Sequence, residues 1–326
     1  MTRTPRPALP LARRARIDAL ADLLDRAPTP PQPPVPGLAR RWPEPARADV
    51  VLRDYVLAPY PPLAPVAGRL AAVNLLVESF AVAGVEAAGV ALVEHLRAVV
   101  GLGRLVWGVK HAGGALAWEF YIYDPGRERA EVTPEAVAPT LAPWLAPPPT
   151  PRAPVPWHMW SLEVDVAALR DHGAARMTVY LGGGDAPGAS RSYAVEPDGA
   201  LTLGNLYTFH DPRREPAQLL ARLATSAHLG SPARGVAAVI EPGLHRCRRL
   251  CVANKRRADG LYFAGIDTDG CARFLARHRW PAPLIGFVDG RRDAFRHLAW
   301  DLGLDFCASA GAGDPSIDKS AVYATA

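Results

Sequence analysis

Charged and aromatic side chains recur at every second position of five short segments. In the last of them, "DKSAVYA", Lys319 and Tyr323 lie on one side because side chains alternate along a strand. A lysine at such a position needs water or a polar partner. Cationic side chains beside tyrosines are suited to holding an anion through charge-assisted hydrogen bonds. The same-side residues of the five segments are Glu119, Tyr121 and Tyr123; Arg176, Thr178 and Tyr180; Asn205, Tyr207 and Phe209; Gly260, Tyr262 and Ala264; and Lys319, Ala321 and Tyr323.

The opposite side of the same segments is apolar apart from two hydroxyl groups. Its residues are Phe120, Ile122, Met177, Val179, Leu206, Thr208, Leu261, Phe263, Ser320 and Val322. The residue types on a solvent-exposed sheet face could vary freely, yet Tyr or Phe recurs on the polar face of every pair. A sheet of ten twisted strands also tends to curl rather than stay open and flat. The pattern predicts a closed barrel whose apolar side faces outward under helices and whose polar side lines a solvent-filled lumen. The alternative is a partly solvated sheet with its tyrosines on the surface.

Strand-like segments arrive in pairs from residue 104 onward, with turn residues inside each pair. The pairs predict five hairpins, at 104–124, 160–181, 190–210, 247–266 and 299–324. Helical periodicity falls between most of them, at 133–146, 215–230, 267–278 and 293–302, whereas only "GGGDAPGA" joins the second hairpin to the third. We therefore expect an α+β fold with a ten-stranded antiparallel barrel at 104–326.

The first 103 residues are rich in proline and otherwise helical in character. Apolar residues at three- and four-residue spacing predict helices within 11–27 and 66–100. The proline-rich stretch at 27–37 predicts a linker or loop, and 147–156 a connection between elements. We expect residues 1–103 to form a mostly helical segment that packs on the barrel.

The net charge and the cysteines indicate which class of partner and which cellular compartment suit the protein. A net charge of +5 and a pI near 9.2 suit an anionic partner, although surface arginines alone could produce the same balance. The longest apolar stretch, 70–96, is interrupted by three glutamates, and the arginine-rich start lacks the apolar core of a signal peptide. The four cysteines show no metal-binding or C-x-x-C spacing. These features favour a cytoplasmic protein with reduced thiols and no membrane partner.

Several common catalytic motifs do not occur in the chain. It lacks "DDxxD", "GxxxxGK[ST]", "HExxH" and "GxSxG", which argues against helical prenyl synthases, P-loop proteins, zinc proteases and α/β-hydrolases. The "GGGD" at 182–185 joins two predicted strands without a helix behind it, so we interpret it as a plain connection. The "DTDG" at 267–270 lacks the calcium-loop pattern and is typical of a helix cap.

The hairpin order, together with "LCVANKRRADGLYFAGIDTDGCARFL" and "IDKSAVY", resembles the ABBA prenyltransferases over residues 104–326. The likeness is closest to the peptide-modifying branch typified by the cyanobactin prenyltransferases. The resemblance implies an enzyme that transfers an allylic prenyl group, from a donor such as dimethylallyl diphosphate, to an aromatic or other nucleophilic side chain of a peptide natural product. It also implies that Mg²⁺ accompanies the diphosphate donor.

The resemblance also implies roles for named residues. The diphosphate-binding positions of the family match Arg176, Lys319, Tyr207 and Tyr262, with Asn205 and Arg257 as further members of that set. The lumen residues that shield the allylic cation match Tyr121, Tyr123, Tyr180 and Tyr323. The inward candidate for proton or metal handling is Glu119. The peptide-modifying branch carries its glutamate one strand earlier, where this chain has Leu105 or Val106. Glu163 and Asp301 are therefore also candidate catalytic carboxylates. Lys319 is expected to be an unpaired cation near Arg176 and Arg257.

Other functions remain open on the sequence alone. The acceptor could be a small aromatic molecule instead of a peptide. A non-catalytic anion-binding barrel would have the same cations, but a carboxylate such as Glu119 gives it no advantage. A nucleic-acid-binding protein could use "HRCRRLCVANKRRADG" as a basic hairpin, with Tyr262 stacking on a base. The basic residues are spread over several hairpins, which favours one central anion over a nucleic-acid strand.

Overall fold

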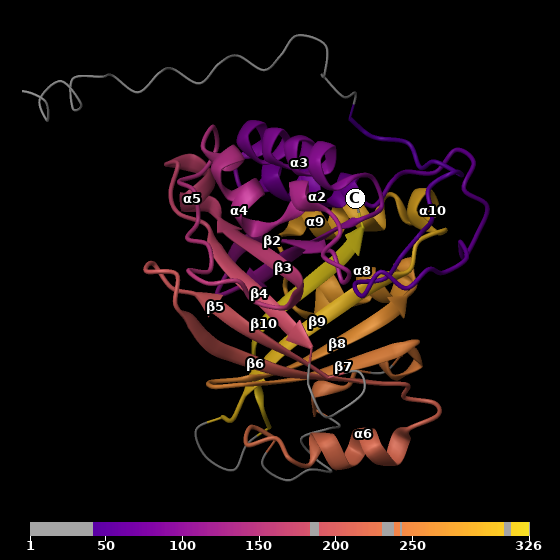
Figure 1. The fold of residues 1–326 in the computed structure, drawn as a ribbon. Helices are drawn as coiled ribbons and strands as arrows, with labels where there is room; N and C mark the ends of the chain where they lie inside the picture. Colours follow the sequence, from indigo (N-terminus) through magenta and orange to yellow (C-terminus); the bar gives the residue numbers. More distant parts are fainter. Residues whose placement is uncertain (1–41, 183–188, 230–237, 242, 310–313, 326) are drawn as a thin grey trace, which may run out of the picture. The chain divides into compact units, whose positions relative to one another are not determined.

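Ten antiparallel strands close into one barrel in the computed structural model, which describes residues 42–182, 189–229, 238–241, 243–309 and 314–325 (Figure 1). The strands are β1 (Leu105–Ala112), β2 (Ala115–Tyr123), β3 (Trp157–Asp165), β4 (Arg176–Gly182), β5 (Ala189–Val195), β6 (Leu201–His210), β7 (Arg249–Lys255), β8 (Asp259–Ile266), β9 (Trp300–Cys307) and β10 (Ser316–Thr325). Each strand pairs with its neighbours in sequence, and β1 pairs with β10 to close the ring. The predicted α+β barrel of five hairpins is confirmed.

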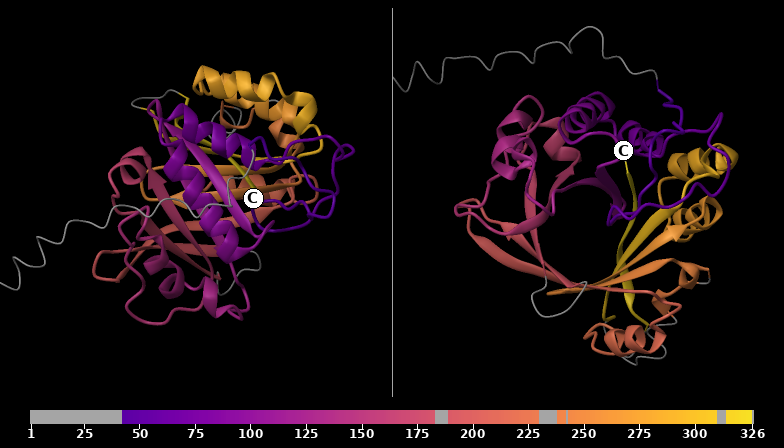
Figure 2. Two further views of the ribbon diagram at one scale, coloured as in Figure 1. Left: turned by 90° about the horizontal axis from the view of Figure 1, so that it is seen from above. Right: turned by 45° about the vertical axis from the view of Figure 1, so that its right-hand side comes forward.

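Helices cover much of the outer surface of the barrel, as both views in Figure 2 show. They are α2 (Val73–Val82), α3 (Glu86–Val100), α4 (Pro134–Val137), α5 (Val166–Arg170), α6 (Pro216–Leu223), α8 (Thr268–Arg277), α9 (Ala282–Asp289) and α10 (Arg292–Phe295). Helices α2 and α3 pack on β1, and α8 packs on β9. Short 3-10 turns lie at Ala130–Val132, Ala138–Leu141 and Leu244–Arg246. No described helix has both the length and the apolar character needed to cross a bilayer.

Buried tryptophans join the outer face of the barrel to the elements that cover it. Trp107, Trp118, Trp160 and Trp300 are fully buried on that face. The Trp118 indole N–H donates to Ser79 Oγ of α2 (2.8 Å), and the Trp300 indole N–H donates to Thr268 Oγ1 of α8 (3.1 Å). These two indoles therefore have a polar partner in the covering helices as well as apolar contacts, which fixes the helices on the strands.

Local capping explains where two predicted helices begin. The Asp267 carboxylate accepts a hydrogen bond from the Gly270 N–H (2.7 Å) at the start of α8, so "DTDG" caps a helix as predicted. The Thr133 hydroxyl caps α4 in the same way, with Pro134 in the first turn. Between α2 and α3 the chain turns at Gly84, whose φ is +71°, so the helical stretch predicted at 66–100 is two helices.

The predicted helices differ from the structure in several places, and some predictions fall outside the described residues. The helix predicted at 133–146 is the single turn α4 followed by the 3-10 turn at Ala138–Leu141, and the helix predicted at 215–230 is α6, which ends at Leu223. The helix predicted at 293–302 is only one turn, α10, because Trp300 already begins β9. Helix α9 was not predicted, because its apolar sequence lacks a polar stripe. The predicted hairpin turn after β3 contains the short helix α5. The helix predicted at 11–27, the linker at 27–37 and most of "GGGDAPGA" lie outside the described residues.

Residues 42–72 run along the barrel before α2. The Tyr60 hydroxyl donates to the Ala299 carbonyl (3.0 Å), and the Leu63 N–H donates to the His297 carbonyl (3.0 Å). This segment and helices α2 and α3 belong to the same compact unit as the barrel, Arg41–Ala326. All four cysteines of the chain are free, and three of them are buried.

Candidate functional site

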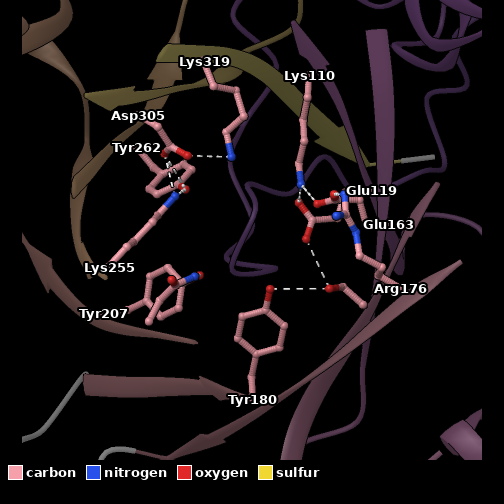
Figure 3. A network of polar contacts seen from close by, with 12 residues as sticks. Lys110, Glu119, Glu163, Arg176, Tyr180, Tyr207, Lys255, Tyr262, Asp305 and Lys319 are labelled. Atoms are coloured by element: carbon pink, nitrogen blue, oxygen red, sulfur yellow. Dashed lines mark hydrogen bonds and ion pairs between the residues drawn. The ribbon is translucent and has the colours of Figure 1, made fainter. Parts of the chain in front are cut away.

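Two groups of charged side chains face each other inside the barrel, near the end that carries the hairpin turns (Figure 3). One group, here the glutamate cluster, contains Lys110, Glu119, Glu163, Arg176 and Ser161 from β1 to β4. The other, here the lysine cluster, contains Lys255, Tyr262, Asp305 and Lys319 from β7 to β10. The alternation predicted from the sequence places all these side chains on the inner face.

Strand register makes the glutamate cluster. Glu119 of β2 lies opposite Glu163 of β3, which in turn lies opposite Arg176 of β4. Two carboxylates on neighbouring strands would repel one another without a cation. The Lys110 ammonium lies 2.6 Å from Glu119 Oε2 and also pairs with Glu163, which binds Arg176 as well. Burial acts to raise the pKa of Glu163, but Lys110 and Arg176 outweigh it and hold that pKa at about 2.

A chain of hydrogen-bonding side chains leads from Glu119 toward the end of the barrel opposite the hairpin turns. The Ser161 hydroxyl donates to Glu119 Oε1 (3.2 Å) and lies 3.4 Å from the Tyr180 hydroxyl. Ser161 is buried, and Tyr180 contributes to the wall of the large cavity described below. Glu119 itself does not line that cavity, so Ser161 and Tyr180 are its polar connection to a ligand there.

One carboxylate joins the members of the lysine cluster. Asp305 Oδ1 lies 2.6 Å from Lys255 Nζ, and Asp305 Oδ2 lies 2.6 Å from Lys319 Nζ. The Tyr262 hydroxyl is 3.0 Å from Lys255 Nζ and 3.2 Å from Asp305 Oδ1. Burial acts to raise the pKa of Asp305, but the two lysines lower it well below its usual range. The expectation that Lys319 is an unpaired cation is wrong, because Asp305 on the adjacent strand is its partner.

Burial also affects Lys255. Desolvation of its ammonium, together with the Lys319 and Lys110 charges, outweighs the attraction of Asp305 and lowers the pKa of Lys255 to about 8. Lys255 therefore loses its proton close to physiological pH. An incoming anion would favour the charged form of Lys255.

Five tyrosines form a layer across the lumen beside the charged clusters. Neighbouring ring centroids lie 6.0 to 6.1 Å apart in the pairs Tyr121 and Tyr180, Tyr121 and Tyr323, Tyr180 and Tyr207, and Tyr262 and Tyr323. Burial raises the pKa of all five, so their hydroxyls stay neutral near pH 7. The Asn205 amide donates to the Tyr207 hydroxyl (2.7 Å), so these two predicted residues do meet.

Glycines on neighbouring strands make room for two of these rings. Gly108 of β1 lies opposite Tyr323, and Gly303 of β9 lies opposite Tyr262. A Cβ at Gly108 would lie 2.4 Å from the Tyr323 ring, and one at Gly303 would lie 2.8 Å from the Tyr262 ring. Both rings pack on bare backbone, which fixes their place in the layer.

A cavity of about 490 Å³ lies on the other side of this layer and reaches the end of the barrel opposite the hairpin turns. Its wall near that end comes from the ends of β2 and β6, the starts of β3, β5 and β7, and the segment before α2. The residues there are Tyr55, Val56, Tyr123, Pro125, His158, Met159, Ala189, Phe209, Arg249 and Cys251. The tyrosine rings thus line this mainly aromatic cavity on the side of the charged clusters.

Three predicted site residues lie away from these clusters. Arg257 is exposed in the turn between β7 and β8. Asp301 is buried near the mouth of the barrel, where its two oxygens accept from the backbone N–H groups of Tyr55 (2.6 Å) and Gly265 (2.9 Å). Burial raises the pKa of Asp301 well above its usual range. Tyr123 also lies at the mouth, where its hydroxyl donates to the Tyr55 carbonyl. Asp301 therefore holds backbone in place.

The sequence analysis did not predict Lys110, Lys255 and Asp305 as site residues. The rarity of lysine in the chain could have pointed to the two lysines. The chain has 37 lysines and arginines, and only three are lysine: Lys110, Lys255 and Lys319. All three lie in the lumen and take part in the two charged clusters. Lysine is a compact charge with three rotatable donors and cannot be exchanged freely for planar arginine. Its confinement to the lumen shows that these three positions differ from the arginine-rich remainder.

No protein-family model matches the chain, and no curated protein is significantly similar to it.

Proposed function

We propose that the protein is a prenyltransferase that moves an allylic group from its diphosphate to a nucleophilic side chain of a peptide. The observation that carries this proposal is that all three lysines of the chain lie in the lumen within charged clusters, one of which contains Tyr262 of the five-tyrosine layer. Breaking the allylic carbon–oxygen bond gives a carbocation and a diphosphate anion. Such a reaction needs cations on one side and aromatic faces on the other.

The lysine cluster would hold the diphosphate. Lys255 and Lys319 outnumber Asp305, and the Tyr262 hydroxyl adds a neutral donor. A diphosphate would take the two ammonium groups from Asp305, and charge-assisted hydrogen bonds of this kind contribute about 1.5 to 3 kcal/mol each. These contacts strengthen as the leaving group gains charge, so they favour the transition state over the bound donor.

The tyrosine layer and the cavity would hold the prenyl chain and the cation. Each tyrosine face contributes about 0.5 to 2 kcal/mol to a cation in a dry site. The layer also keeps water from the reacting carbon, because water would otherwise capture the cation. The acceptor enters from the mouth of the cavity, and its nucleophilic atom forms the new bond to the allylic carbon while the diphosphate leaves.

The proton released by the acceptor would pass to Glu119. The chain of Tyr180, Ser161 and Glu119 spans the distance between the cavity and that carboxylate. Tyr180 accepts the proton as it gives up its own to Ser161, which passes one to Glu119. Lys110 stabilises the charged carboxylate before transfer. Glu163 is bound by both Lys110 and Arg176, and Asp301 by backbone, so neither is as well placed as Glu119.

Residues of the lumen do not by themselves form a magnesium site. Across the residues that the structure describes, no group of three or more His, Cys, Asp or Glu side chains is arranged to hold a metal. The carboxylates of Glu119, Glu163 and Asp305 are each paired with lysine or arginine. Mg²⁺ would therefore enter with the diphosphate as part of the donor, and its oxygen ligands would be those of the donor and water.

Two other functions are less well supported. The basic hairpin proposed for nucleic acid is divided, because Arg248 and Arg249 bind Asp54 whereas Lys255 faces the lumen. A simple anion carrier would have no use for the hydrogen-bonded chain from Tyr180 through Ser161 to Glu119. A small aromatic acceptor would use the same chemistry as a peptide, and the substrate panel below distinguishes the two.

The test is incubation of the full chain with dimethylallyl or geranyl diphosphate, Mg²⁺, and a panel of Trp, Tyr and His peptides and free phenols. Mass spectrometry should show the acceptor plus one prenyl group and release of diphosphate. A Lys255→Ala, Lys319→Ala double variant should lose transfer, whereas Arg191→Ala, on the exposed outer face of β5, should keep it. Stabilisation by inorganic diphosphate without any transfer would favour a carrier, and equal, salt-sensitive stabilisation by an oligonucleotide would favour nucleic-acid binding.

A further inference from the structure

We infer that Arg249 makes the mouth of the cavity a subsite for a carboxylate, so that the ligand of this cavity is an aromatic group that belongs to an acid. The inference rests on the proposed function in calling this ligand the acceptor. The subsite itself follows from the charge, the position and the free N–H groups of Arg249.

One charged side chain lies in the described wall of the 490 Å³ cavity. The other described lining residues are aromatic, aliphatic or small and polar, with no aspartate or glutamate among them, and burial lowers the pKa of His158 so that its ring is neutral near pH 7. Arg249 lies on the inner face of β7, as do Cys251, which also lines the cavity, and Lys255 of the lysine cluster. A single cation in a neutral, mainly aromatic wall would fix the orientation of an anionic ligand.

Arg249 has hydrogen-bonding capacity that the protein does not use. Its Nη1 donates to Asp54 Oδ2 (3.2 Å), whereas its Nε and Nη2 make no hydrogen bond to a described residue, and solvent reaches both nitrogens. The side chain as a whole is 33% exposed. Nε and Nη2 form one edge of the guanidinium group, and two parallel N–H groups of this kind match the two oxygens of a carboxylate.

Asp54 does not cancel the charge at the mouth. Its carboxylate is shared between Arg249 and Arg248 (3.7 Å), and it also accepts from two backbone N–H groups of its own turn. Burial raises the pKa of Asp301, the other acid in this region, well above its usual range, so Asp301 offers less counter-charge. Two arginines and one paired carboxylate leave an excess of positive charge where the cavity opens.

Aromatic rings lie beside this cation. Phe209 of β6 is opposite Cys251, the next inward residue of β7 after Arg249. The Phe209 ring is stacked with that of Tyr55, with centroids 6.3 Å apart, and both rings line the cavity. An aromatic ring among these side chains would lie close enough to Arg249 for a carboxylate on the same ligand to reach the free guanidinium edge.

The two ends of β7 thus carry two different cations. About 20 Å of strand separates Arg249 from Lys255, and the tyrosine-lined part of the lumen lies along this length. The diphosphate at Lys255 and the carboxylate at Arg249 would hold the donor and the acceptor from opposite ends. Arg249 would also be too far from the allylic carbon to repel the carbocation.

The test measures binding without donor, by calorimetry on the full chain. The probes are N-acetyl-tryptophan, which has a carboxylate, and N-acetyl-tryptophanamide, which is neutral. The parent should bind the acid about 5- to 15-fold more tightly, as expected for charge-assisted hydrogen bonds at a partly exposed site. This preference should shrink as salt is added.

Substitutions then assign the preference to Arg249. Arg249→Gln should bind the two probes equally, and Arg249→Lys should keep part of the preference because the charge remains without the planar fork. Arg248→Gln is the matched control, since it also loses a contact with Asp54. The Arg248 guanidinium lies over the Tyr60 ring, 4.7 Å from its centroid, and is not in the cavity wall, so this variant should keep the full preference.

A third probe, N-acetyl-aspartyl-tryptophanamide, identifies the source of the carboxylate. Tighter binding of this probe than of N-acetyl-tryptophan would place an acidic side chain on Arg249, and the reverse order would place a C-terminal carboxylate there; both results support the subsite. A parent that binds both acids no more tightly than the neutral amide would overturn it. A folded Arg249→Gln variant that keeps the preference would do the same.

Separate outcomes decide the inference and the proposed function. If the preference depends on Arg249 but no peptide in the panel is prenylated, the subsite stands and the proposed reaction fails. If prenylation occurs and Arg249→Gln leaves the ratio of KM values for acidic and amidated acceptors unchanged, the reaction stands and the subsite fails. If Arg249→Gln weakens inorganic diphosphate as much as N-acetyl-tryptophan, the arginine belongs to the donor site and the inference is overturned.

Discussion

The Tyr323 ring packs directly on the backbone of Gly108 in the neighbouring strand, where a Cβ would lie 2.4 Å from the ring. Gly108→Ala should therefore push Tyr323 out of the tyrosine layer. Overpacking of this kind costs about 1 to 3 kcal/mol of unfolding free energy. Denaturant unfolding measures the loss, and Gly182→Ala, whose new methyl would meet nothing within 4 Å, is the control. Equal stability of the two variants would show that Tyr323 can move aside without cost.

Lys319→Ala should reduce turnover far more than it reduces stability. On the proposed function it removes a contact worth about 1.5 to 3 kcal/mol to the leaving group, or about 10- to 150-fold in rate. Asp305 keeps Lys255 and Tyr262 as partners, and Lys319 is partly exposed, so unfolding free energy should fall by about 1 kcal/mol or less. Lys319→Arg should recover part of the rate. An unfolded Lys319→Ala variant would show instead that the lysine is structural.

The affinity for inorganic diphosphate should fall as pH rises through about 8, because Lys255 loses its proton there. Lys255→Arg should remove this step, since arginine stays charged. Calorimetric titrations between pH 6.5 and about 9.5 would show both behaviours. A parent whose affinity is flat across this range would contradict the low pKa of Lys255.

Lys255 also makes the unfolding free energy of the ligand-free protein depend on pH, and this free energy rises with pH whereas the diphosphate affinity falls. The folded pKa of Lys255, about 8, lies below its ordinary value of 10.5, so between these values the unfolded chain binds more protons than the folded one. The contribution of Lys255 to unfolding free energy should therefore rise with pH across that window. Comparing urea unfolding of the parent with Lys255→Met at pH 7.5 and 9.5 isolates it: the advantage of Lys255→Met should shrink at the higher pH.

Lys110→Met should be the most destabilising lysine substitution. It leaves Glu119 and Glu163 opposite each other, with only Arg176 to neutralise the pair. Removing one partner of a buried ion pair typically costs about 3 to 5 kcal/mol. A second change, Glu119→Gln, should restore part of the loss, because it removes the carboxylate left unpaired. Urea unfolding of the single and double variants gives both numbers, and a double variant no more stable than Lys110→Met would argue against repulsion as the cause.

The division of each strand into an outer and an inner face could be predicted from the sequence. Residues such as Phe120 and Val322 fall on the packed side, and Tyr121 and Tyr323 on the lumen side, because side-chain alternation is fixed by backbone geometry. Five hairpins with one repeated pattern then favour a closed barrel. Helix α9 was missed because its sequence is apolar on most sides and shows no polar stripe, although only Leu284 and Val288 are buried in the structure.

The pairing of charges was decided only by the tertiary structure. Lys255 and Asp305 are 50 positions apart, and Tyr55 meets Asp301 across 246, so no local pattern connects them. Those contacts depend on the register between strands: the pairing of β9 with β10 places Asp305 opposite Lys319, and the pairing of β1 with β2 and of β2 with β3 brings Lys110 near Glu163. Alternation along one strand determines which way a side chain points. Its partner on another strand is determined by the register in which the strands pair, because a shift of register by one residue would reverse every face.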